Sequence, residues 1–167
     1  MVNELLEASK NWAWTSQEQP HHNLEAMVGE QIFTSPGFKV TQQGIENFAQ
    51  VTGDRQWIHI DPERARKESP YRSTIAHGFF LVSLIPYLRD IDNDKHYQPF
   101  RLAINIGVDN IRFLSAVKPG QYVCIRSRLS DVRNFGRYVE VVEHIIMEKH
   151  PQYKTVCSMD SILRLYY

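Results

Sequence analysis

Residues 75–88 of the chain read IAHGFFLVSLIPYL, and this stretch decides the fold. Its length and composition predict a helix whose side chains leave almost no polar face. A helix that is apolar all round in a soluble protein has to be buried on nearly all sides. Pro86 removes one backbone hydrogen bond, so we expect a kink or an early end between Ser83 and Tyr87.

The chain after Pro99 changes to the alternating apolar and polar pattern of β-strands. Short connections between consecutive strands imply an antiparallel meander. Such a sheet needs an apolar partner on its inner face. We therefore expect an α+β domain in which the sheet wraps around the apolar helix. The predicted strands cover residues 102–115, 122–129, 137–147 and 155–166.

Capping signals predict two further helices before the apolar one. Thr41 can cap a helix that Gly53 ends, because glycine adopts the left-handed conformation of a C-terminal cap. Asp61-Pro62 begins a second, short helix that runs to about Lys67. A strand or extended piece is expected over residues 31–40, broken by a turn in its middle.

Composition excludes several classes of protein. The 167 residues include 19 Lys+Arg and 19 Asp+Glu, so the formal net charge is zero. A neutral chain lacks the basic surface expected of a protein that binds nucleic acid or anionic membranes. No segment approaches the roughly 18 consecutive apolar residues of a membrane-spanning helix. Acidic residues near the start argue against a signal peptide, so we expect a cytoplasmic protein.

The chain is expected to form one domain over residues 29–167, preceded by a helical arm and linker over residues 1–28. His21 and His22 in the linker lack a carboxylate or cysteine at ligand spacing, so a solvated turn is the preferred interpretation. Cys124 and Cys157 form no CxxC pair. Neither a zinc site nor a disulfide framework is therefore expected.

Residues 48–62 read FAQVTGDRQWIHIDP and are the most informative stretch for the chemistry of the chain. Asp54 and His59 lie five positions apart in the loop between two predicted helices, so the loop can bring them to one site. A carboxylate beside an imidazole can hold a water molecule and move its proton near neutral pH, where histidine titrates. The spacing alone is also typical of an aspartate in a turn near a packed histidine.

Residues 76–79 read AHGF and open the apolar helix. Gly78 presents a backbone N–H with no side chain in the way, and a helix N-terminus adds partial positive charge. A carbonyl oxygen that becomes negative needs such a donor. The alternative is that Gly78 merely lets the helix pack closely.

The two motifs, in this order, resemble those of the MaoC-like dehydratases and (R)-specific enoyl-CoA hydratases, a family with a subgroup labelled nodulation protein N-like. The resemblance covers all of the chain except the N-terminal arm. It is carried by residues 52–62 (TGDRQWIHIDP) and 75–78 (IAHG), and by the segments 102–107, 112–113 and 117–120.

This resemblance implies a hotdog fold, in which a curved antiparallel sheet wraps a long central helix, and homodimers with substrate channels near the subunit interface. It implies reversible addition of water to a trans-2-enoyl thioester of CoA or an acyl carrier protein, giving the (R)-3-hydroxyacyl product. Asp54 and His59 would activate the water and pass a proton to the α-carbon, and the Gly78 N–H would bind the thioester oxygen. No organic cofactor or metal is expected, because the thioester supplies the acidity and the site supplies positioning and charge stabilisation.

Four other residues are predicted to bind substrate: Gln56, Trp57, His77 and Asn105. Gln56-Trp57 replaces the commoner Asn-Pro of the family motif, and the large Trp57 ring could narrow the channel. His77 could instead orient the start of the helix, and Asn105 could satisfy a buried neighbour. Pro86 stands where some relatives carry a serine that orients the site, so that hydrogen bond is absent or comes from elsewhere.

Two alternatives keep the fold and change the function. A hotdog acyl-CoA thioesterase would direct water to the carbonyl carbon, although hotdog hydrolases usually place their carboxylate elsewhere. A non-catalytic subunit would bind acyl thioesters without turnover, which the departures at residues 56, 57 and 86 leave open. Release of free CoA distinguishes the thioesterase from both other functions.

Overall fold

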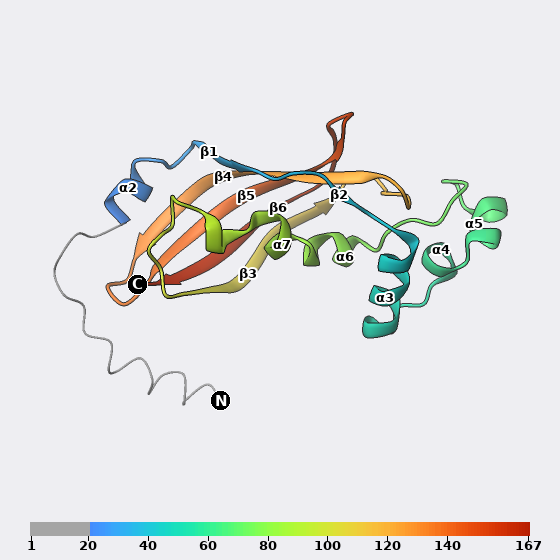
Figure 1. Ribbon diagram of the computed structural model, residues 1–167, viewed down its shortest axis with the longest axis horizontal. Helices are drawn as coiled ribbons and strands as arrows, with labels where there is room; N and C mark the ends of the chain where they lie inside the picture. The colour runs from blue at the N-terminus through green and yellow to red at the C-terminus, as the bar shows by residue number, and fades with distance from the viewer. Residues whose placement is uncertain (1–20) are drawn as a thin grey trace.

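Four long strands form the frame of the protein, and two short strands extend it (Figure 1). The structure is a computed structural model that describes residues 21–167, so the helix expected near the N-terminus lies outside the described range. All strand pairs are antiparallel, in the order β1-β4-β5-β6-β3, with β2 beside β4. The strands are β1 (Gln31–Thr34), β2 (Phe38–Lys39), β3 (Leu102–Phe113), β4 (Tyr122–Asn134), β5 (Val139–His150) and β6 (Lys154–Tyr166).

The strand order corrects the prediction of a simple meander. β3 pairs with β6 at one edge of the sheet, and β4 lies on the other side of β5. The segment between β3 and β4 therefore crosses the end of the sheet. Val117 in this segment is fully buried, and its carbonyl oxygen accepts a hydrogen bond from Ala76 N–H at 2.8 Å. Alternation along a strand indicates which face is buried, but it does not indicate which neighbour the strand pairs with.

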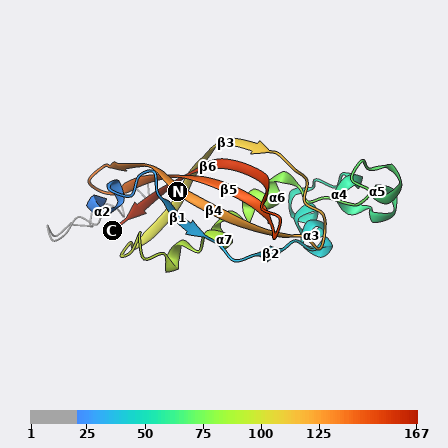
Figure 2. The same cartoon turned by 90° about the horizontal axis from the view of Figure 1, so that it is seen from above.

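The apolar stretch forms two short helices, α6 (Gly78–Ser83) and α7 (Ile85–Arg89), along one face of the curved sheet (Figure 2). The interruption at Leu84 confirms the break expected from Pro86. That proline lies in the first turn of α7, where a missing N–H costs no hydrogen bond. The core joins this helix pair to the sheet through Phe80, Leu81, Ile85, Leu88, Val123, Ile125, Ile145, Met147, Val156, Cys157 and Met159.

Burial of the helix pair is one-sided. Phe79 and Tyr87 keep 66% and 71% of their surfaces exposed in the single chain. The expectation that the helix is buried on nearly all sides was wrong for these two residues, because the sheet covers only the opposite side. Phe113, on the edge strand β3, packs edge-to-face against the Phe79 ring, with ring centroids 6.0 Å apart. The Phe113 side chain is itself half exposed.

Three helices gather beyond one end of the sheet (Figure 1). Thr41 Oγ1 accepts from Gly44 N–H at 3.0 Å, and Gly53 ends the first of these helices at φ 78°, as predicted. Asp61 Oδ1 accepts from Arg64 N–H at 2.9 Å, which confirms the second predicted start. A one-turn helix between them was not predicted. The three are α3 (Gln42–Thr52), α4 (Trp57–Ile60) and α5 (Pro62–Glu68).

A second apolar cluster lies at the opposite end, where Leu24 of α2 (His21–Glu25) is fully buried. Its other buried members are Ile32, Tyr97, Leu129, Val139, Val141 and Leu165. The division of the chain at residue 28 stays a prediction. No helix within residues 21–167 has the length and apolar character needed to cross a membrane.

A buried ion cluster of Arg89, Asp94 and Glu143 lies between α7 and the sheet. Arg89 Nε donates to Glu143 Oε2 at 2.7 Å, and Arg89 Nη1 lies 2.6 Å from Asp94 Oδ2. Tyr97 Oη donates to Glu143 Oε1 at 2.7 Å. All four side chains are almost completely buried. Each buried carboxylate therefore faces the Arg89 guanidinium, which carries the one positive charge among these side chains.

Candidate active site

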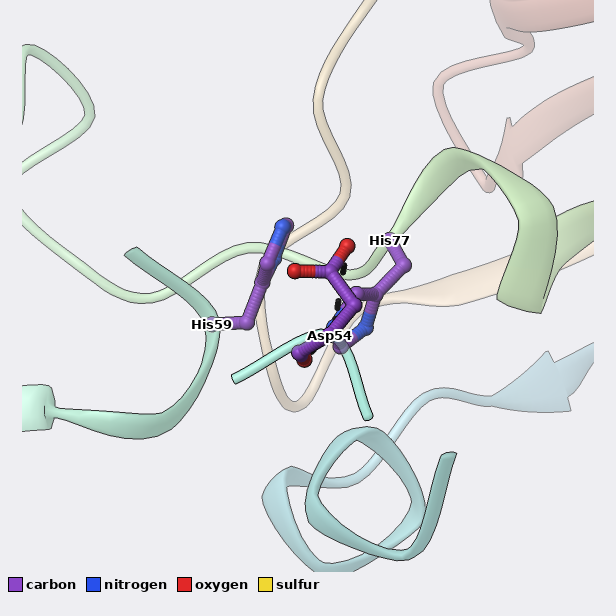
Figure 3. Close-up of side chains that lie close together, drawn as sticks. All are labelled: Asp54, His59 and His77. Carbon is purple, nitrogen blue, oxygen red and sulfur yellow. Dashed lines mark hydrogen bonds and ion pairs between the residues drawn. The ribbon is translucent and has the colours of Figure 1, made fainter. Parts of the chain in front are cut away.

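Three polar side chains converge where the α3–α5 group meets the start of α6 (Figure 3). Asp54 lies in the loop after α3, His59 lies in α4, and His77 immediately precedes α6. One polar atom from each lies within 4.8 Å of those from the other two. The structure thus brings together the two residues that local spacing suggested, and it adds a third from 18 positions further along the chain.

His59 is held as a neutral imidazole with one free nitrogen. Its Nδ1 lies 2.7 Å from the carbonyl oxygen of Ile75. Because a carbonyl oxygen can only accept, Nδ1 carries the hydrogen and Nε2 keeps its lone pair. Burial lowers the pKa of His59 below the ordinary 6.5, and the hydrogen bond to Ile75 only partly offsets this effect. A ring in this state can accept a proton at neutral pH.

The backbone of His59 is supported by side chains from two other segments. Gln42 Nε2, at the start of α3, donates to the His59 carbonyl oxygen at 2.9 Å. Thr74 Oγ1 donates in turn to Gln42 Oε1 at 2.6 Å. In addition, Ile75 N–H donates to the Ile58 carbonyl oxygen at 3.1 Å. These bonds fasten α4 to α3 and to the segment before α6.

Asp54 presents its carboxylate to solvent, with 55% of the side chain exposed. Its Oδ1 accepts a long hydrogen bond of 3.4 Å from Gln56 N–H, and its Oδ2 lies 4.0 Å from His77 Nε2. Figure 3 shows the carboxylate beside the two imidazole rings. Polar atoms at separations up to 4.8 Å can be bridged by one water molecule. Asp54 and His59 are therefore placed to hold a water between them.

His77 lies deeper than the other two, with only 3% of its surface exposed. Its ring stacks on the His59 ring, with centroids 3.7 Å apart and planes inclined by 24°. Its Nε2 donates to the backbone carbonyl oxygen of Asp54 at 3.0 Å. The predicted substrate-binding residue therefore contacts the two predicted catalytic residues.

Gly78 is the first residue of α6, so its N–H has no acceptor within the helix. α6 is only six residues long, so the N–H group itself matters more than a helix dipole. Three ring atoms of Phe113 lie 2.7–2.9 Å from where a Cβ on this residue would stand. Close packing under Phe113 therefore requires glycine here, whatever else its N–H does.

Gln56 and Trp57 lie next to Asp54, at the start of α4. The backbone of Gln56 contacts Asp54, and its side chain is exposed. The guanidinium of Arg64 lies over the Trp57 ring at 4.5 Å from the centroid. This contact holds the tryptophan against α5 and fixes one wall beside the site.

Asn105 is not brought to this group. It lies on β3, eight positions before Phe113, which corresponds to roughly 26 Å along an extended strand. Its Oδ1 accepts from Gly107 N–H at 3.2 Å. The side chain lines a separate cavity under α7, together with Ile85, Arg89 and Glu143. β3 is also the edge strand of the sheet.

Sequence reasoning gave no role to Phe113 or Gln42. Phe113 belongs to a segment that carried the family resemblance, but its packing on Gly78 depends on how β3 passes the start of α6. The Gln42 contact with His59 spans 17 positions. No local pattern indicates such a contact.

Asp54, His59 and His77 each offer one atom that could bind a metal ion, and these atoms all lie within 4.8 Å of one another. Zinc–nitrogen bonds of about 2.0–2.1 Å in a tetrahedron place ligand atoms about 3.4 Å apart. The two imidazoles also stack face to face, and each uses one nitrogen to donate to a backbone carbonyl.

Residues 23–149 match the family model described as MaoC like domain. The chain is 36% identical over 143 residues to 3-hydroxyacyl-thioester dehydratase Z of Mycobacterium tuberculosis, covering 85% of this chain and 93% of that protein. The chain belongs to the MaoC-like dehydratase family. This MaoC-like chain is also 38% identical over 111 residues to nodulation protein N of Rhizobium meliloti, covering 66% and 68% of the two proteins. The predicted family is thus confirmed.

Solved structures confirm the predicted hotdog fold of this MaoC-like protein. A MaoC-like dehydratase from Rhodospirillum rubrum superposes with a TM-score of 0.68 at 19% identity, covering 86% of this chain and 95% of the other. The (R)-hydratase of A. caviae gives a TM-score of 0.61 at 17% identity, covering 80% and 95%. At these identities the likeness shows the fold alone.

Proposed function

We propose that the protein is an (R)-specific enoyl-CoA hydratase, which in reverse is a 3-hydroxyacyl-thioester dehydratase. The observation that carries the proposal is the convergence of an exposed carboxylate, Asp54, with a neutral histidine, His59, beside the first N–H of α6. Membership of the MaoC-like family and the relative named a dehydratase at 36% identity support it.

In the proposed hydration, Asp54 and His59 hold a water molecule beside C3 of a trans-2-enoyl thioester. His59 Nε2 takes one proton from the water molecule while the oxygen of the water forms a bond to C3. The electron pair of the double bond moves towards the thioester, whose oxygen becomes negative. Gly78 N–H donates a hydrogen bond to that oxygen. The dyad then returns a proton to C2, which completes the addition of water.

The proposed reaction is neutral in redox terms, since one water is added and nothing is oxidised or reduced. The residues of the site supply a base, a proton donor and a hydrogen bond to the oxygen. We therefore propose that the enzyme needs no cofactor and that the CoA or acyl-carrier thioester is purely a substrate.

We further propose that two copies of the chain form a homodimer. Apolar side chains stay exposed on the helix pair and along the edge strand β3: Phe79, Tyr87, Leu102, Ile106, Phe113 and Leu114. A second copy seated on this surface would cover them. Solved neighbours whose names describe two-protein complexes, HadBC and ChsH1-ChsH2 of Mycobacterium tuberculosis, make a heteromer the competing outcome. Replacing Phe79 with serine should shift the oligomer towards monomer in analytical ultracentrifugation.

A cytoplasmic location accompanies the proposal. Both cysteines, Cys124 and Cys157, are free and buried. Unpaired thiols are usual in a reducing compartment.

The decisive experiment is hydration of crotonyl-CoA, followed by loss of the enoyl-thioester absorbance. We expect turnover to (R)-3-hydroxybutyryl-CoA by the wild type and a fall of roughly 10²–10⁴-fold in Asp54→Asn. Asp92→Asn, which changes an exposed acid in the short 3-10 helix after α7, is the matched control and should keep full activity.

Other outcomes identify the alternatives. Release of free CoA would mean a thioesterase. Binding without turnover, across a panel of longer and branched enoyl thioesters, would mean a non-catalytic subunit.

A further inference from the structure

His77 is held firmly at the junction between the sheet and α6. The preceding Ala76 N–H donates to Val117 O at 2.8 Å, and the carbonyl oxygen of His77 accepts from Leu81 N–H at 3.3 Å. The Phe48 ring packs against the imidazole, with centroids 5.1 Å apart. The ring of His77 therefore has a fixed position from which to support its neighbours.

The loop that carries Asp54 is otherwise weakly held. Within residues 21–167, Asp54 N–H reaches Thr52 Oγ1 at 3.4 Å, and Asp54 Oδ1 accepts from Gln56 N–H at the same long distance. The bond from His77 Nε2 to the Asp54 carbonyl oxygen is shorter, at 3.0 Å. It is the firmest of the three contacts on Asp54.

The same ring also restricts His59. Stacking with centroids 3.7 Å apart blocks one face of the His59 ring, and the bond from Nδ1 to Ile75 O restricts rotation of the ring. His77 thus contacts Asp54 through an edge of its ring and His59 through a face. One peptide bond joins His77 to Gly78, which carries the proposed oxygen-binding N–H.

We infer that His77 is a positioning residue: it holds Asp54, His59 and the Gly78 N–H in fixed positions relative to one another and does not contact the substrate. This inference rests on the proposed hydratase function. The 4.0 Å gap between His77 Nε2 and Asp54 Oδ2 is too long for a hydrogen bond, so the imidazole holds the backbone of Asp54 and leaves its carboxylate to the substrate.

Two substitutions separate the two contacts. His77→Gln keeps a side-chain N–H for the Asp54 carbonyl and loses the ring. His77→Phe keeps a ring for stacking and loses the donor. Each variant should lower kcat by about tenfold with KM nearly unchanged, and His77→Ala should lower kcat by about 10²-fold or more, because small misplacements of reacting groups are costly.

The pH dependence of kcat/KM is a further measurement, and it should not change if the role of His77 is only structural. Asp54 and His77 are the charged or titratable neighbours that act on His59, and His77 lowers the pKa of His59. Removing the imidazole should therefore move the acid limb of kcat/KM to higher pH in His77→Gln. Phe48→Leu, which loosens the packing around His77 but keeps both of its contacts, is the control. It should lower Tm and leave the acid limb in place.

Several results would overturn the inference. If His77→Gln and His77→Phe both keep the full kcat per folded molecule, His77 has a purely structural role. A rise in KM at constant kcat would make it a substrate contact. Complete loss of one limb of the pH profile in His77→Gln would make it an acid–base catalyst.

Nitrogen-15 NMR of the imidazoles tests the same point without turnover. We expect His59 to carry its hydrogen on Nδ1 in the wild type and to titrate at higher pH in His77→Gln. An inactive wild type that still shows this change would refute the hydratase function and keep the positioning role. Identical His59 titrations in both proteins would refute the positioning role.

Discussion

Gly78→Ala tests whether glycine is needed at this position for close packing under Phe113 or also for binding the thioester oxygen through its N–H. A Cβ there would lie 2.7 Å from the nearest ring atom of Phe113, whereas ordinary contacts begin at 3.4 Å, so the ring has to move by 3.4 − 2.7 = 0.7 Å. Overpacking costs about 1–3 kcal/mol, and a half-exposed ring at the end of a strand should fall at the lower end. Alanine regains little of the roughly 1 kcal/mol by which it exceeds glycine in a helix interior, because Gly78 is the first residue of α6.

The net expectation is a loss of about 1 kcal/mol in the free energy of unfolding, which corresponds to a fall of roughly 2–4 °C in Tm for a chain of this size. The rate should fall more than stability does, because the methyl group lies next to the N–H that receives the thioester oxygen. Removal of an oxygen-binding donor costs roughly 10²–10³ in kcat, and a crowded donor should cost at least tenfold.

Gly78→Ala combined with Phe113→Ala separates the two roles. Removing the ring relieves the clash, so a double-mutant cycle on unfolding in urea should show a favourable coupling of about 1 kcal/mol. The crotonyl-CoA rate should stay low relative to Phe113→Ala alone. Recovery of the rate together with stability would refute the oxygen-binding role and leave Gly78 a packing residue.

Two further predictions follow from buried groups. Glu143→Gln removes one of the two carboxylates that face Arg89 in the core and leaves Asp94 to balance its charge, so urea unfolding should show a loss of about 1–3 kcal/mol, and no loss would contradict the assigned ion pair. Burial lowers the pKa of His59, and only the neutral ring can accept a proton, so kcat/KM should hold as pH falls to 6.5 and decline below it. A decline that begins above pH 6.5 would show that another group controls the rate.

Local signals in the sequence predicted much of the fold. Thr41, Gly53 and Asp61 act through neighbours within four positions, so their caps are visible as short patterns. Pro86 likewise predicts a break from its own chemistry. The pairing of β3 with β6 depends on the path of a crossing segment whose contacts are distant in sequence, and no periodicity encodes it.

The contacts of the site also fall into two groups, those that local spacing predicts and those that it does not. Asp54 and His59 are five positions apart, so their approach could be proposed from spacing. The contact of His77 with Asp54 spans 23 positions, so no local pattern indicates it. Asn105 was predicted to bind substrate, but the structure places it in a separate cavity under α7.

The interruption at Leu84 divides the apolar stretch into two short helices with different surroundings. α6 carries the proposed catalytic N–H at its first residue, while α7 borders the cavity that contains Asn105 and ends at the buried Arg89. A continuous helix would transmit a shift of one end rigidly to the other. Because Ile85 lines that cavity and follows the break, we expect a substitution there to alter the cavity more than the position of Gly78.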